Sequence, residues 1–304
     1  GTAVGSTRDD RATEVPDHGT RHAANRPGGG ADRGTSGGRA PHRGGPPGAY
    51  PGRVSEQRST PGPVDATSRG GGADGGPVAL TGLAAYLELA AFGLLAGRSV
   101  DAPDLVTRQA LASAAGRVLG RQERLLAVAA TRGVDATAAM TPFDGVLADF
   151  DARTEPDSWS EGLLKGVVGH GVAQDLCREL TRGLPADEAA ELRRAVDDGW
   201  PEEADGPATV VLAQAAEQDP VLASRLALWG RRVVGEALGL VPALLAAHPV
   251  LAGLAAAARR ADAAETGETV GEPGGDEAAE VRSWLISRLT AEHTRRMDRM
   301  GLAA

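Results

Sequence analysis

The stretch VALTGLAAYLELAAFGLLAG, residues 78–97, decides the fold of this chain. Its leucines and alanines do not alternate with polar residues as in a strand, and Glu88 is its only charge. A helix this apolar is either buried in a protein core or inserted in a bilayer. Because a bilayer would place the Glu88 carboxylate in mid-membrane, we predict a core helix and no membrane contact.

Helical patterns continue downstream of this stretch, and no window carries a strong strand pattern. Proline and glycine mark several boundaries, with Pro103 suited to a first turn and Gly133 to a left-handed cap. Pro242 predicts a kink or an early end of its helix. The expected helices cover residues 79–96, 104–132, 158–182, 186–198, 208–217, 220–244, 251–262 and 277–300. Such a series predicts an all-α bundle.

Residues 1–77 differ in composition from the helical part, residues 78–304. They contain 19 glycines and nine prolines without a fixed period, and few apolar side chains. That composition is typical of a disordered tail, because too little apolar surface is available to offset the entropy of ordering the backbone. Ten arginines against eight acidic residues allow contact with an acidic partner, although a solvated linker is the favoured interpretation.

Charge and cysteine content restrict the function. The chain carries a net charge of −9, which argues against a large nucleic-acid interface. Cys177 is the only cysteine, so no intrachain disulfide and no cysteine-based zinc site can form. No secretory pattern begins the sequence, and we expect a cytoplasmic protein.

Glu88 falls on the core-facing stripe of its predicted helix, with Leu80 and Leu95. An isolated buried charge costs several kcal/mol, so such a carboxylate must be paired, protonated or bound to a metal. A metal-ligand role and pairing with an arginine such as Arg117 or Arg121 both remain open, and pairing is favoured.

Other polar residues also lie on predicted core stripes. Glu236 has Arg231 and Arg232 nearby in the sequence, which favours an ion pair over a metal. His170 and His293 lie on apolar faces, where a histidine is more often a hydrogen-bonded core residue than a ligand. The arginines of the last helix are interpreted as a solvated face; they are Arg282, Arg288, Arg295, Arg296 and Arg299.

Four stretches carry a family resemblance: YLELAAF (86–92), GVDATAAMTPFDGVLADFDARTEPDSWSEGLLKGVVGHGVAQDLCREL (133–180), RLALWGRRVVGEAL (225–238) and LTAEHTRRMDRMGLAA (289–304). Together they resemble the ferritin-like domain of the tRNA-hydroxylase (MiaE)-like proteins. This resemblance implies a ferritin-like four-helix bundle with additional helices. In the related hydroxylases, a carboxylate-bridged di-iron pair activates oxygen to hydroxylate the isopentenyl group of a modified tRNA adenosine.

The resemblance also supplies candidate metal ligands. Glu88 matches the carboxylate of the first helix, and His170 stands where the family has an aspartate, with Asp175 just over one turn further on. Glu236 completes the candidate set of Glu88, His170, Asp175 and Glu236. A surviving site of this type would hold di-iron; otherwise we predict no cofactor.

The sequence departs from the family pattern in its metal motifs. Ferritin-like di-iron sites use Glu-x-x-His on two helices, and no Glu-x-x-His occurs in this chain. The second predicted helix reads VLGR at 118–121, where Arg121 would repel a cation, and Pro201 interrupts the region expected to hold the other motif.

Three functions follow as hypotheses. The first is a ferritin-like protein with a degenerate di-iron site and a structural or interaction role, through self-association or an unknown protein partner. The alternative is an active di-iron oxygenase that hydroxylates a modified tRNA base with an atypical ligand set. A third hypothesis is a tRNA-binding helper without catalysis.

Overall fold

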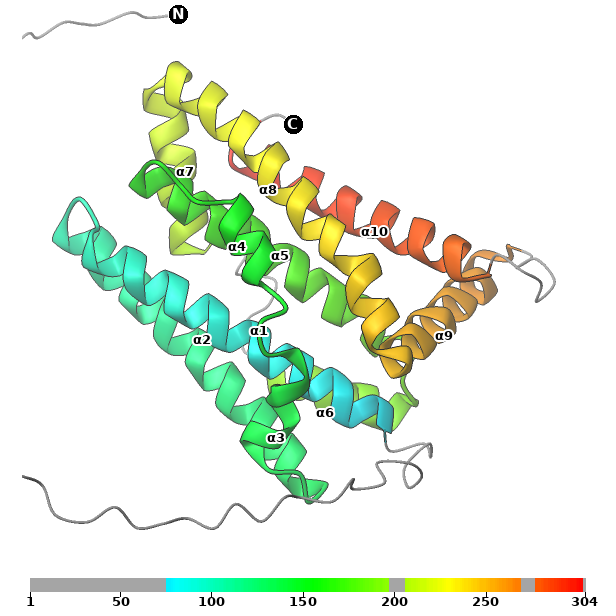
Figure 1. The fold of residues 1–304 in the computed structure, drawn as a ribbon. Coiled ribbons are helices and arrows are strands. Elements are labelled where there is room, and N and C mark those ends of the chain that lie inside the picture. The colour runs from blue at the N-terminus through cyan, green and yellow to red at the C-terminus, as the bar shows by residue number, and fades with distance from the viewer. Residues whose placement is uncertain (1–74, 197–205, 269–276, 303–304) are drawn as a thin grey trace, which may run out of the picture. The chain divides into compact units, whose positions relative to one another are not determined.

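The computed structural model describes residues 75–196, 206–268 and 277–302, and the described residues form helices without a strand (Figure 1). The elements are α1 (Gly75–Val100), α2 (Leu105–Thr131), α3 (Ala136–Met140), η1 (Thr141–Phe143), α4 (Ala148–Arg153), α5 (Trp159–Thr181), α6 (Ala186–Val196), α7 (Pro207–Gln218), α8 (Pro220–Ala247), α9 (Pro249–Thr266) and α10 (Glu277–Arg299). The predicted all-α fold is confirmed. Apart from its last three residues, the predicted tail lies outside the described residues.

Local sequence explains most helix boundaries. The side chains of Asp104, Ser158 and Asp219 accept backbone hydrogen bonds at the first turns of α2, α5 and α8. Gly133 follows α2 with a φ of 71°, a left-handed conformation that glycine adopts without strain. The sequence predicted helices to start and stop at these places, but Pro103, which was expected in the first turn of α2, lies before its Asp104 cap.

Pro242 does not end its helix, so the prediction of an early end is wrong: α8 continues to Ala247. Proline removes one backbone hydrogen bond. The residues around it, Val241, Leu244 and Leu245, are buried, and their packing holds this part of the chain in the bundle.

The segment around Pro142 and Gly145, where no helix was predicted, contains three short helical elements, α3, η1 and α4. The first of them packs closely on α1, where a Cβ atom added at Gly82 would lie 2.0 Å from the Ala139 carbonyl oxygen. Such short elements are too short to show a repeating pattern of apolar residues in the sequence. They are held in a defined conformation by this tertiary contact.

Helix α5 occupies the centre of the bundle. It packs against α1 on one side and against α8 and α10 on another, while α1 packs most extensively against α2. Figure 1 shows α5 between the α1–α2 pair and the α8–α10 pair. One stripe of α2 is buried along the helix, and it consists of Leu111, Ala115, Val118, Gln122, Leu125 and Ala129.

Helix α1 is long and apolar enough to cross a membrane by length and composition. Half of its most apolar window is buried inside the bundle, as in a core helix of a globular domain. Helices α8 and α9 pass the same test together, but they are bent by 111° at the break between them.

Candidate functional site

Glu88 is the centre of a buried polar network between three helices. Its Oε2 atom accepts a hydrogen bond from Nε of Arg121 on α2 at 3.1 Å. Its Oε1 atom lies 3.2 Å from Nε2 of His170 on α5 and accepts a weaker bond from the Gln174 amide at 3.4 Å. Glu88 is 4% exposed and Arg121 2%. The favoured expectation, pairing of Glu88 with an arginine of the neighbouring helix, is confirmed.

The network keeps Glu88 ionised. Burial raises the pKa of this carboxyl, but the charges and hydrogen bonds of His170 and Arg121 lower it by more, so the pKa lies below its ordinary value. His170 is therefore a hydrogen-bonded core histidine, as expected. Both oxygens of Glu88 are occupied by nitrogen donors of the protein itself.

Asp175 lies further along α5 and belongs to a second cluster. Oδ1 accepts from Arg178 at 2.7 Å, and Oδ2 accepts from Arg296 of α10 at 2.7 Å. The Asp175 side chain is 3% exposed. One buried carboxylate thus serves two guanidinium groups.

Arg296 of α10 is therefore not on a solvated face, whereas Arg288, with 40% of its side chain exposed, is only partly covered. Arg296 is largely buried against Asp175, and Arg288 donates two hydrogen bonds to Glu179 of α5. The helical pattern correctly placed the apolar stripe of α10 but could not show that α5 offers buried carboxylates at its edges.

Glu236 is half-buried, with its side chain 31% exposed, and is not part of the buried stripe of α8. The buried stripe of α8 consists of Leu226, Gly230, Val233, Ala237, Val241, Leu244 and Leu245. This stripe is rotated by about one position from the predicted seam, which places Glu236 at its edge. The partner of Glu236 is Arg153 of α4 at 3.4 Å, and Arg232 instead donates to the Arg153 carbonyl. The favoured expectation of an ion pair is confirmed, but the partner is Arg153 and not Arg231 or Arg232.

His293 is buried in the core, as expected, but without the expected hydrogen bonds. Neither of its ring nitrogens has a hydrogen-bond partner among the described residues. Burial and the nearby charge of Arg296 lower its pKa to about 4, so the ring is neutral near neutral pH.

The four candidate metal ligands do not converge. Glu88 and His170 are in contact, whereas Asp175 and Glu236 bind arginines elsewhere. No group of three or more His, Cys, Asp or Glu side chains suited to a metal ion occurs among the described residues. A di-iron pair requires several carboxylate and imidazole ligands, so the described residues do not fit one. Pro201, in the region expected to hold the second Glu-x-x-His motif, lies outside the described residues.

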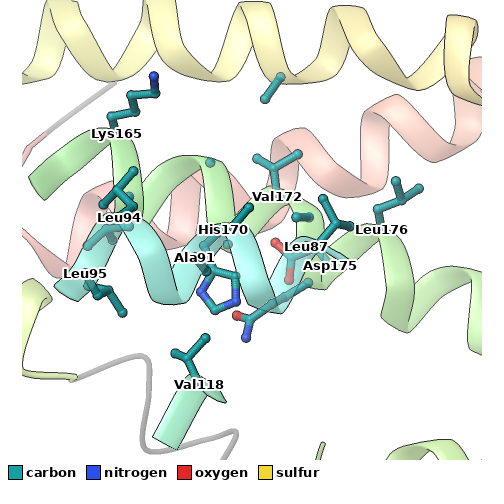
Figure 2. A pocket seen from close by; sticks show the side chains of 18 of the residues that line it. Leu87, Ala91, Leu94, Leu95, Val118, Lys165, His170, Val172, Asp175 and Leu176 are labelled. Atoms are coloured by element: carbon teal, nitrogen blue, oxygen red, sulfur yellow. The ribbon is translucent and has the colours of Figure 1, made fainter. Parts of the chain in front are cut away.

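A cavity of about 620 Å³ adjoins the Glu88 network, and residues of α1, α2, α4, α5, α8 and α10 and of the first turn of α7 line it (Figure 2). Most of its wall is apolar, and His170 and Asp175 add polar atoms. Residues labelled in the view include Leu87, Ala91, Leu94, Leu95, Val118, Lys165, His170, Val172, Asp175 and Leu176. The sequence did not predict this cavity, because the space left unfilled depends on how side chains from different helices pack together.

Cys177 follows His170 and Gln174 on the same face of α5. Burial, together with the negative charge of Glu88, raises the pKa of its thiol to about 12, against a smaller opposite effect of Arg178. The thiol therefore stays protonated and is a poor nucleophile or metal ligand.

Comparison with known proteins identifies the family. A family model described as a ferritin-like domain of actinomycetes matches residues 74–257, which is more than half of the chain. No curated protein matches this chain. The matched region includes α1, α2, α5 and α8 with the whole Glu88 network and most of the cavity wall. By this match the chain belongs to the ferritin-like domain family of actinomycetes.

Proposed function

We propose that this protein is a tRNA-hydroxylase-like member of the ferritin-like fold that does not use a di-iron centre and acts as a structural or interaction module. The observation that supports the proposal is the buried pair of Arg121 and Glu88, with Nε and Oε2 3.1 Å apart. In a di-iron protein of this fold, the carboxylate of the first helix would bind metal.

Arg121 is a poor neighbour for a metal centre. Its guanidinium carries a permanent charge that repels a cation, and it cannot be deprotonated in a protein. A metal bound to Glu88 would have to break the Arg121 and His170 contacts and would place a further positive charge beside the buried guanidinium. Breaking a buried pair in this way costs about 3–5 kcal/mol.

The set of donors also argues for a non-metal role. A ferritin-like di-iron site draws on four carboxylates and two imidazoles from four helices. The Glu88 network contributes one carboxylate and one imidazole, and its remaining members, Arg121 and Gln174, act as hydrogen-bond donors. The network therefore joins α1, α2 and α5 through hydrogen bonds and an ion pair.

Iron content tests this proposal. The full chain is produced in iron-supplied cells beside a known di-iron protein, and iron per chain is measured by plasma mass spectrometry. We expect iron far below one atom per chain, and the same trace amount in Glu88→Gln. One or two iron atoms per chain in the wild type, lost in Glu88→Gln, would overturn the proposal and restore the oxygenase hypothesis.

A further inference from the structure

The cavity beside the Glu88 network has the size of a small-molecule site. Such sites typically measure about 300–1,000 Å³ and combine an apolar wall with a few polar groups, and this cavity measures about 620 Å³. Most of its wall consists of apolar side chains, chiefly from α1, α2, α5 and α8. A ligand of matching chemistry has an apolar body of moderate size and few polar groups.

Leucines of α1 leave apolar surface uncovered along this wall. Leu80 and Leu83, near the start of the helix, are fully buried. Leu87, Leu94 and Leu95 line the cavity and are only half-buried, although α1 packs against both α2 and α5 (Figure 2). An apolar molecule that replaces the water beside these side chains is favoured by the hydrophobic effect.

His170 brings a polar ring to the same wall, and Figure 2 shows it near Ala91 and Val118. Its Nε2 atom lies 3.2 Å from Oε1 of Glu88, and because an ionised carboxylate only accepts hydrogen bonds, Nε2 is the donor. Its Nδ1 atom forms no hydrogen bond with a described residue, and the side chain is 15% exposed. Nδ1 is therefore available to a molecule in the cavity.

A hydroxyl group suits Nδ1 in either protonation state of the ring. Nδ1 accepts a hydrogen bond when the imidazole is neutral and donates one when it is protonated, and a hydroxyl group can do both. A halogen or methyl group at the same place would remove water from Nδ1 without replacing its hydrogen bond, which weakens binding.

Charge pairing within the wall favours a neutral ligand over an ionic one. The charged residues of the wall that are buried, Arg121, Lys165 and Asp175, all form ion pairs. Residues 197–205, which precede Gly206 of the wall, lie outside the described residues and include five acidic residues, so the exposed arginines of the wall indicate no preference for an anion. An ionic ligand would also lose hydration against the leucines.

We propose that the cavity binds a neutral, largely apolar alcohol, with its hydrocarbon body against the leucines of α1 and its hydroxyl group at Nδ1 of His170. This site rests on the proposed function in one respect, because Glu88 must hold His170 and Arg121 rather than a metal ion. It gives the interaction role a small-molecule ligand.

The binding test uses the full chain after removal of co-purified lipids. Calorimetry measures 1-octanol, and competition with it measures 1-chlorooctane, octanoate and octylammonium, which share its hydrocarbon chain and differ in the end group. We expect one octanol site per chain and about fivefold weaker binding of chlorooctane, which forms no hydrogen bond with Nδ1. Octanoate and octylammonium are expected to bind more weakly than octanol.

A variant of His170 tests the position of the hydroxyl group. His170→Gln keeps an N–H donor for Glu88 but has no counterpart of Nδ1. We expect octanol binding to weaken about fivefold and chlorooctane binding to stay unchanged, whereas a purely structural role of His170 would change both affinities alike. The octanol–chlorooctane comparison in the wild type decides the inference even if this variant does not fold.

A matched pair of glycine variants locates the hydrocarbon body. Both Gly93 and Gly97 are exposed on α1, with open space around an added Cβ atom, but only Gly93 lines the cavity. Gly93→Phe is expected to occupy part of the cavity and to weaken octanol binding several-fold. Gly97→Phe is its control and should bind octanol as the wild type does.

Several results would overturn the inference. They are no saturable binding of octanol, equal affinities for octanol and chlorooctane, tighter binding of octanoate or octylammonium than of octanol, or equal octanol affinities in the two glycine variants. Iron content is measured on the same preparation. Failure of the ligand site with iron absent leaves the non-metal role standing, whereas stoichiometric iron overturns that role whatever the binding result.

Discussion

At the scale of single residues, the site depends on which partner each buried charge finds. Glu88 was ambiguous in the sequence between a metal ligand and an ion-paired residue. The structure shows which residues contact Glu88. Arg121 of α2 and His170 of α5 both lie within hydrogen-bond distance of its carboxylate. Sequence spacing can place one residue on a face of its own helix, but it cannot say which residue of another helix stands opposite.

Removal of Arg121 should destabilise the bundle through its partner. Arg121→Met leaves Glu88 buried with only His170 and Gln174, and we expect a loss of about 3 kcal/mol in the free energy of unfolding. The double variant Arg121→Met with Glu88→Gln should recover most of that loss, since neither charge of this pair remains. Urea unfolding followed by circular dichroism measures both. If the double variant is no more stable than Arg121→Met, the loss of stability in Arg121→Met does not come from the buried charge of Glu88.

His293 should make stability dependent on pH. Its pKa is about 4 in the folded protein against an ordinary value near 6.5, so the unfolded chain binds the proton more readily. The stability due to the neutral ring is fully present above about pH 6.5 and is lost as pH falls toward about 4, which amounts to about 2 kcal/mol by pH 5.

The measurement for His293 is the free energy of urea unfolding at a series of pH values. The control is His293→Leu, in which other titrating groups such as Glu88 remain. We expect the difference between wild type and variant to change over this pH range. A difference that stays constant with pH would exclude His293 as the source.

At the scale of helices, the fold relies on close approaches that glycine permits. An alanine Cβ at Gly82 would collide with the Ala139 backbone. Helices α1 and α3 can therefore approach this closely only because Gly82 has no side chain. The helical pattern of α1 predicted its burial. It did not predict α3, because a five-residue helix has no period long enough to read.

Gly82→Ala should therefore destabilise the protein although alanine favours helices. We expect a cost of about 2 kcal/mol from overpacking. Gly97→Ala, on the same helix with nothing near its added Cβ, should stabilise by up to about 1 kcal/mol. Thermal unfolding of the two variants checks this, and equal melting temperatures would contradict the close α1–α3 contact.

At the scale of the whole molecule, charge is unevenly distributed. The net charge of −9 does not show which arginines are held in buried ion pairs, because pairing depends on position in the fold. The arginines of α10 illustrate the same point. Arg295 and Arg299 are exposed, whereas Arg296 between them is held by the buried Asp175.

The sequence alone determined the helical fold class and most helix boundaries, because hydrophobic period, caps and helix breakers are local properties of the chain. It also identified Glu88 and His170 as polar residues on core faces. Only the tertiary structure decided that these two meet Arg121, that Asp175 and Glu236 go to other arginines, and that a cavity remains beside them. The physical reason is that electrostatic pairing and unfilled space depend on the rotation and approach of helices far apart in the sequence.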